Sequence, residues 1–125
     1  MRRIEALADS IMRYTAYLGE PDTESYQARN PGALKAFSIK HPRTNGGLRI
    51  FRSFVDGYQA LLYDLETKCA GKSRSKLTPE SNLRDLMRVY GFPLPMADFV
   101  AKFLRKALQN DSLGADLPLS FFLEE

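Results

Sequence analysis

Four stretches of the chain carry apolar side chains at the spacing of an amphipathic helix, and a glycine follows close after the first three of them. They cover residues 3–18, 54–69, 78–90 and 96–109. Ser53 is a predicted N-cap for the second stretch, and Thr78-Pro79-Glu80 is a predicted start for the third. The sequence therefore predicts a mostly helical protein with about four helices.

Two short runs between the first and second helices alternate apolar and basic residues. They are residues 34–40 and 48–53, and Asn45-Gly46-Gly47 lies between them. Asn-Gly is a strong turn signal because both residues tolerate positive φ. We therefore expect one small antiparallel β-hairpin here, which makes the predicted fold α+β, mostly α. Residues 20–32, which precede it, are polar and contain two prolines, so they are expected to form a loop.

The length and composition fit one compact domain. The chain has 125 residues, of which 44% are hydrophobic and 26% charged, and these are ordinary values for a globular protein. We expect a single domain over residues 1–125 with a less regular C-terminal tail at residues 110–125. Phe121-Phe122-Leu123 in that tail is expected to dock back onto the domain, the alternative being contact with a partner.

The sequence also favours a small soluble protein in the cytoplasm. Arg2 and Arg3 are followed by Glu5 and Asp9, so no apolar region typical of a signal peptide can be drawn. No run approaches the roughly 18 apolar residues that a membrane-spanning helix requires, so no membrane contact is expected. Cys69 is the one cysteine, which rules out an intramolecular disulfide and fits a reducing compartment.

We expect neither a metal nor a cofactor. The chain has one histidine and one cysteine, and its acidic residues are scattered rather than spaced as metal ligands. No glycine-rich loop opens a helix after a predicted strand, so a nucleotide-phosphate cradle is not expected. His41 lies between Lys40 and Arg43, and neighbouring positive charge disfavours it as a general base.

Positive charge is concentrated in one part of the chain. Residues 25–55 contain no Asp or Glu and carry a net charge of +6, so the remainder of this +3 chain carries −3. Such asymmetry is typical of a binding face. The candidate binding residues are Arg29, Asn30, Lys35, Lys40, Arg43, Arg49 and Arg52.

A longer pattern runs through residues 28–90. It consists of Ala28-Arg29-Asn30-Pro31-Gly32-Ala33-Leu34, Gly47-Leu48-Arg49-Ile50-Phe51-Arg52-Ser53, Gly57-Tyr58-Gln59-Ala60-Leu61-Leu62 and Leu83-Arg84-Asp85-Leu86. In order and spacing it resembles a phage and prophage module with an Arg-Asn-Asn-Asn-Pro-Gly-Asn motif. This chain keeps one asparagine, Asn30, where that family has three. The resemblance implies a virion structural or cell-wall-associated protein.

Three functions remain open from the sequence. The first is a binding or structural module whose basic hairpin face contacts an acidic protein or an anionic polymer. The second is nucleic-acid binding by the same residues, with Phe37, Phe51 and Phe54 interleaved among them as stacking surfaces.

The third is a lysozyme-like peptidoglycan hydrolase with Glu24 as its general acid. Glu24 lies between the first predicted helix and the predicted hairpin, as such acids do, and Glu24-Ser25-Tyr26 is similar to the start of soluble lytic transglycosylases. A binding role is favoured over an enzymatic one, because no nucleophile elbow or acid–base pair accompanies these residues.

Overall fold

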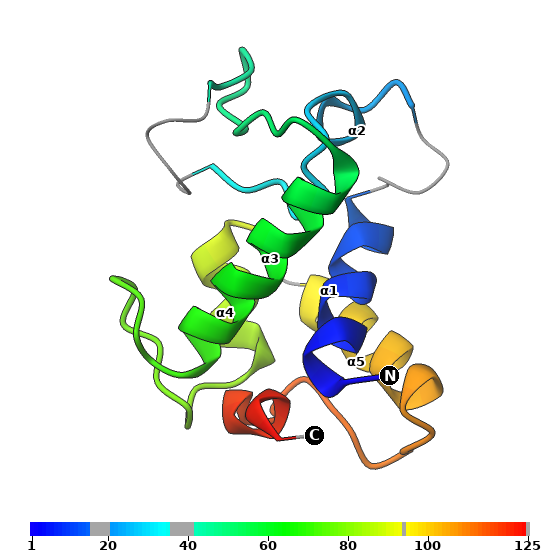
Figure 1. Ribbon diagram of the computed structural model, residues 1–125. Coiled ribbons are helices and arrows are strands. Elements are labelled where there is room, and N and C mark those ends of the chain that lie inside the picture. Colours follow the sequence, from blue (N-terminus) through cyan, green and yellow to red (C-terminus); the bar gives the residue numbers. More distant parts are fainter. Residues whose placement is uncertain (16–20, 36–41, 94, 125) are drawn as a thin grey trace. The chain divides into compact units, whose positions relative to one another are not determined.

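The computed structural model describes residues 1–15, 21–35, 42–93 and 95–124 (Figure 1). Within these ranges the chain forms five α-helices and a short C-terminal 3-10 helix. They are α1 (Arg3–Tyr14), α2 (Glu24–Gln27), α3 (Phe54–Cys69), α4 (Leu83–Tyr90), α5 (Met96–Ala107) and η1 (Leu119–Leu123). The mostly helical prediction is confirmed. The β-hairpin prediction is wrong, because the same ranges contain no β-strand.

The segment after the Asn-Gly turn is held by several partners instead of one strand. The turn itself forms, with a hydrogen bond of 2.9 Å from the Gly47 amide to the Thr44 carbonyl. The amide of Ile50 then donates to Pro42, and Arg43 and Arg49 form an isolated antiparallel bridge. The amides on either side of Ile50 donate to other segments: Arg49 donates to Leu34, and Phe51 donates to Ala28. No ladder forms because the partner changes from one amide to the next. Most of the first predicted run, residues 36–40, lies outside the described residues.

Local capping explains where the helices begin and end. Ser53 accepts from the Asp56 amide at 3.1 Å, so its predicted N-cap role is confirmed and α3 starts at the next residue. The predicted start of α4 at residues 78–80 is wrong, because Asn82 forms a reciprocal capping box with Asp85 and the helix begins at Leu83. The predicted stop at Gly91 is confirmed, and this glycine adopts a left-handed φ of 76°.

The short helix α2 lies where a loop was expected. Its N-cap is Thr23, whose hydroxyl accepts from the Tyr26 amide at 3.3 Å. At the other end, the Ala28 amide donates to the Glu24 carbonyl. This single turn orders the residues that lead into Arg29 and Asn30.

Contacts divide the chain into two compact units, which are considered separately. One consists of Met1–Ser10 with Leu65–Glu125, and the other of Ile11–Asp64. Helices α4 and α5 pack together in the first unit. Its fully buried side chains include Leu7, Leu65, Leu83, Leu86, Met96, Val100, Leu104 and Leu119. The second unit buries Ile11, Ala28, Leu34, Leu48, Phe51 and Leu61.

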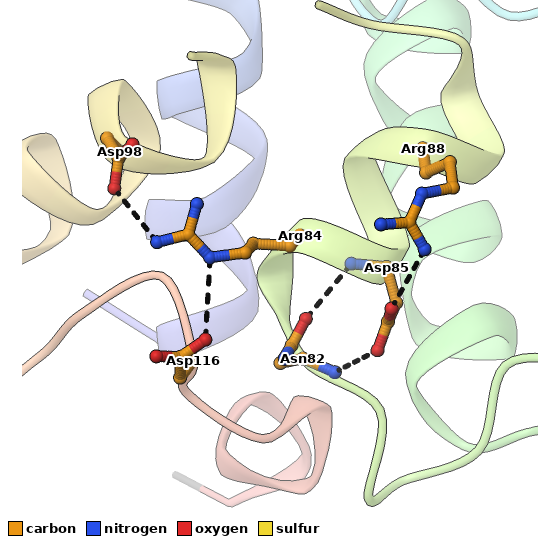
Figure 2. Close-up of polar contacts among 6 residues, drawn as sticks. All are labelled: Asn82, Arg84, Asp85, Arg88, Asp98 and Asp116. Atoms are coloured by element: carbon orange, nitrogen blue, oxygen red, sulfur yellow. Dashed lines mark hydrogen bonds and ion pairs between the residues drawn. The ribbon is translucent and has the colours of Figure 1, made fainter. Parts of the chain in front are cut away.

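Surface ion pairs tie the start of α4 to its neighbours in the first unit. Figure 2 shows Arg84 between Asp98 of α5 and Asp116, each at 3.4 Å. The same view shows the Asn82–Asp85 capping box and the pair between Arg88 and Asp85. All of these side chains are substantially solvent-exposed, so the ion pairs contribute little to stability compared with the buried apolar residues.

The predicted docking of the C-terminal aromatic segment is confirmed for Phe122, whereas Leu123 is 45% exposed. Phe122 is 3% exposed, and the amides of Leu119 and Ser120 donate to the carbonyls of Ser81 and Pro79. Arg3 donates to the Phe121 carbonyl at 3.1 Å, and its guanidinium carbon lies 4.0 Å from the centre of the Phe121 ring. These contacts join the two ends of the chain within the first unit. Across the described residues, every helix is too short or too polar to cross a membrane.

Candidate anion-binding site

Asn30 is completely buried and organises the backbone of the basic segment. Its Nδ2 donates to the carbonyls of Leu34 and Arg49, both at 2.9 Å, and its Oδ1 accepts from the Leu34 amide at 2.9 Å. The side chain thereby joins two segments that are far apart in sequence. Asn30 was a candidate binding residue, and its burial and hydrogen bonds instead assign its amide a structural task.

The neighbouring residue, Arg29, is held in an uncommon backbone conformation. Its φ is +53°, in the left-handed region that few residues other than glycine adopt. Its amide donates to Tyr26, and its carbonyl oxygen lies so close to Gly57 of α3 that no side chain fits there. The Arg29 Nη1 donates to the Phe51 carbonyl at 3.2 Å. The guanidinium is therefore oriented by one hydrogen bond, and a guanidinium has five N–H donors.

Arg29 and Arg52 line the same open pocket of about 590 Å³, called the arginine pocket below. Its lining residues are Pro21, Tyr26, Gln27, Arg29, Arg52, Ser53 and Phe54. Both arginines are exposed, and in the described part of the chain neither forms an ion pair with a carboxylate. None of the described lining residues is acidic. Within the described part of the chain, the pocket therefore presents two arginines that form no ion pair.

Two partly exposed aromatic side chains border the arginines. Tyr26 is 41% exposed and Phe54 is 39% exposed. Tyr26 belongs to α2, and Phe54 is the first residue of α3, directly after its N-cap. The Phe54 ring stacks on Tyr58 with centroids 5.8 Å apart. Helix caps thus fix the backbone beneath both rings, and the N-terminal end of α3 adds positive potential at the pocket.

The remaining sequence candidates lie in different environments. Lys35 and Arg43 are exposed but do not line the arginine pocket, and Arg49 is 8% exposed. Lys40, Phe37 and His41 lie outside the described residues. Phe51 is 2% exposed, which removes it as a stacking surface. Of the seven candidate binding residues, the fold thus brings Arg29 and Arg52 together.

A second open pocket of about 400 Å³ surrounds the candidate catalytic residue, Glu24. This glutamate pocket is lined by Asp22, Glu24, Gln27, Ala28, Thr44, Asn45 and Ile50, and it shares Gln27 with the arginine pocket. Glu24 is exposed, and its Oε2 accepts from the Thr44 hydroxyl at 2.8 Å. The general acid of a glycosidase instead lies in an apolar pocket that keeps its carboxyl group protonated. Here five of the seven described lining residues have polar side chains, and Ala28 and Ile50 are the apolar members.

Sequence reasoning missed Tyr26 and Gln27 as lining residues. A one-turn helix is too short to show periodicity, and the available signal was Thr23 as an N-cap three residues before Tyr26. Among the described residues, no three His, Cys, Asp or Glu side chains lie together in a group that could hold a metal ion.

Comparison of the chain with known protein families, with characterised proteins and with solved structures found no match.

Proposed function

We propose that this protein is a binding module that holds a phosphate-bearing anionic polymer at the arginine pocket. The observation that carries the proposal is the pairing of exposed Arg29 and Arg52 around one pocket whose described lining has no acidic residue. Guanidinium groups bind phosphate through planar, charge-assisted hydrogen bonds. A polymer fits better than a single ion because the pocket is open and the surrounding residues 25–55 carry a net charge of +6.

The preorganisation of Arg29 supports this proposal. Its left-handed backbone is a strained conformation for a residue with a side chain, and such strain clusters at functional positions. The bond to the Phe51 carbonyl holds the guanidinium before any ligand arrives. Less side-chain entropy is then lost on binding, which favours affinity.

The resemblance to the phage-type module is compatible with such a role. We propose that the run Asn30-Pro31-Gly32 shapes the backbone beside the pocket, because Asn30 is buried and bonded to main-chain groups on both sides. The ligand contact would then come from Arg29, directly before that motif, and from Arg52.

The geometry favours binding over peptidoglycan hydrolysis. Glu24 is exposed and takes a hydrogen bond from Thr44, whereas the general acid of a glycosidase is enclosed in an apolar pocket. We expect the purified protein not to clear a peptidoglycan suspension. Clearing that disappears in Glu24→Gln would support the hydrolase instead.

The binding proposal is tested by titrating the protein with inorganic polyphosphate in dilute salt. We expect the double variant Arg29→Gln/Arg52→Gln to bind at least tenfold more weakly than the natural chain, because two charge-assisted contacts are lost. The single variant Arg52→Gln is also needed, since Arg29 has a structural hydrogen bond and no such bond is observed for Arg52 among the described residues. Arg52→Gln should bind polyphosphate more weakly than the natural chain and more tightly than the double variant. Its thermal melt should be unchanged.

The matched control removes the same charge from another basic segment. Arg74→Gln/Lys76→Gln lowers the net charge by two within an exposed loop that is not part of the arginine pocket. This variant should bind within about threefold of the natural chain if the pocket is the site. Equal losses in both double variants would show a general charge effect, and the proposed site would be wrong.

A further inference from the structure

We infer that the polymer held at the arginine pocket is a single-stranded nucleic acid, with one unstacked base lying against Tyr26 and Phe54. This inference rests on the proposed function, because it assigns the phosphate of the same strand to Arg29 and Arg52. It extends that proposal by giving the two aromatic side chains a ligand. A base in a duplex is already stacked, so the inference specifies a single strand.

Basic and aromatic side chains line one and the same pocket. A phosphate polymer alone is satisfied by arginines and has no use for aromatic surface. Tyr26 and Phe54 are each about two-fifths exposed beside the two arginines. Basic groups that track the backbone, next to aromatic rings that receive bases, are the recurring arrangement in proteins that bind single strands.

The backbone beneath both rings is held in place. The backbone of Tyr26 is tied to Thr23, and Phe54 follows the Ser53 cap and stacks on Tyr58 at an angle of 18°. A ring that is already stacked, as Phe54 is, loses little freedom when a base packs against it. The pocket volume of about 590 Å³ lies in the range of small-molecule sites and accommodates one nucleotide.

The arginine pocket also contains uncharged polar side chains. Gln27 and Ser53 line it together with the rings. An amide and a hydroxyl can each donate and accept, so they can bond to the edge of any base without selecting one. We therefore expect the pocket to bind a strand that carries bases more tightly than an abasic strand. We expect it to discriminate only weakly among the base types.

The experiment compares two labelled single strands of about 15 nucleotides, an oligothymidylate and an abasic strand with the same number of phosphates. Fluorescence anisotropy should give an affinity for the oligothymidylate about tenfold higher than for the abasic strand, as expected for one stacked base. Tyr26→Ala should remove most of that advantage and leave the affinity for the abasic strand unchanged. Tyr63→Ala is the matched control, because Tyr63 is 65% exposed on α3 and does not line the pocket.

The outcomes separate the two proposals. Equal affinity for the two strands, both lost in Arg29→Gln/Arg52→Gln, would overturn the nucleic-acid inference and leave the polyanion site intact. Failure of both strands and of inorganic polyphosphate to bind would overturn both. An equal loss for the two strands in Tyr26→Ala, with a lowered melting temperature, would give Tyr26 a structural role and would contradict base stacking there.

Discussion

At the residue scale, Asn30 and Arg29 divide two tasks between adjacent positions. The Nδ2 and Oδ1 atoms of Asn30 both form hydrogen bonds with main-chain groups, whereas the side chain of Arg29 lines the pocket. Buried main-chain groups must be bonded, so the Asn30 amide replaces hydrogen bonds that a regular strand would otherwise supply. Residue type alone suggested that both side chains bind a ligand, and burial is what distinguishes them.

Removal of the Asn30 amide is expected to lower the free energy of unfolding by about 2–4 kcal/mol. Asn30→Ala deprives the Leu34 amide and the Arg49 carbonyl of these bonds, although the Leu34 carbonyl still accepts from Arg49. Asn30→Asp should be at least as harmful at neutral pH, because an oxygen would face two carbonyl oxygens. Urea unfolding measures both.

The control for these variants is Asn45→Ala in the exposed turn, which should stay within about 0.5 kcal/mol of the natural chain. If Asn30→Ala were as mild as this control, the proposed role of the buried amide would be wrong.

At the element scale, α3 is the support of the arginine pocket. Its N-terminal residues line the pocket, and Gly57, one turn further on, lets the Arg29 main chain approach the helix. A glycine inside a helix normally lowers stability relative to alanine. Here the missing Cβ provides the space that the Arg29 carbonyl and Pro31 occupy.

Gly57→Ala should therefore reverse the usual effect of this substitution. In an open helix it would stabilise by up to about 1 kcal/mol, but overlap with the Arg29 carbonyl should instead destabilise by about 1–3 kcal/mol. Binding of polyphosphate should weaken as well, because Arg29 must shift. Gln59→Ala, on the exposed side of α3, is the control for helix propensity. A more stable Gly57→Ala protein would contradict the close approach.

The helix ends offer a second test of backbone conformation. Gly91 after α4 and Gln109 after α5 both adopt the left-handed conformation, with φ of 76° and 51°. A Cβ on Gly91 would meet no atom within 4 Å, so φ alone decides the effect there. Gly91→Ala should destabilise by about 1 kcal/mol, and Gln109→Gly should stabilise by about 0.5–1 kcal/mol. Thermal melts that move in the same direction for both variants would contradict this reading.

Helices α3 and α4 and the run at residues 48–53 show which parts of the fold could be predicted from the sequence. Periodicity and capping predicted α3 and the stop of α4, because those signals are local to each helix. The run at residues 48–53 predicted extended backbone, but alternation cannot say which carbonyls its amides will meet, and they meet three different segments. The arginines of the pocket were among the sequence candidates. Their convergence, and the burial of Asn30 and Arg49, depend on tertiary contacts that no local pattern contains.

At the scale of the whole molecule, the charge pattern and the pocket coincide. The segment without acidic residues, 25–55, falls entirely within the unit Ile11–Asp64, and so do the described lining residues of the arginine pocket. The other unit contains the ion pairs of Figure 2, where Arg84 and Arg88 are matched by carboxylates. Arg29 and Arg52 form no such ion pair among the described residues, and this pocket is where we place the ligand.

The most direct test of that claim is the salt dependence of binding. The affinity for the labelled single strand should be measured from about 50 to about 200 mM salt for the natural chain and for Arg29→Gln/Arg52→Gln. Each lost phosphate contact lowers the slope of log K against log salt by about 0.7, so the double variant should show a slope smaller by ~1.4. Arg74→Gln/Lys76→Gln should keep the natural slope. An unchanged slope in Arg29→Gln/Arg52→Gln would contradict the assignment of phosphate binding to these two arginines.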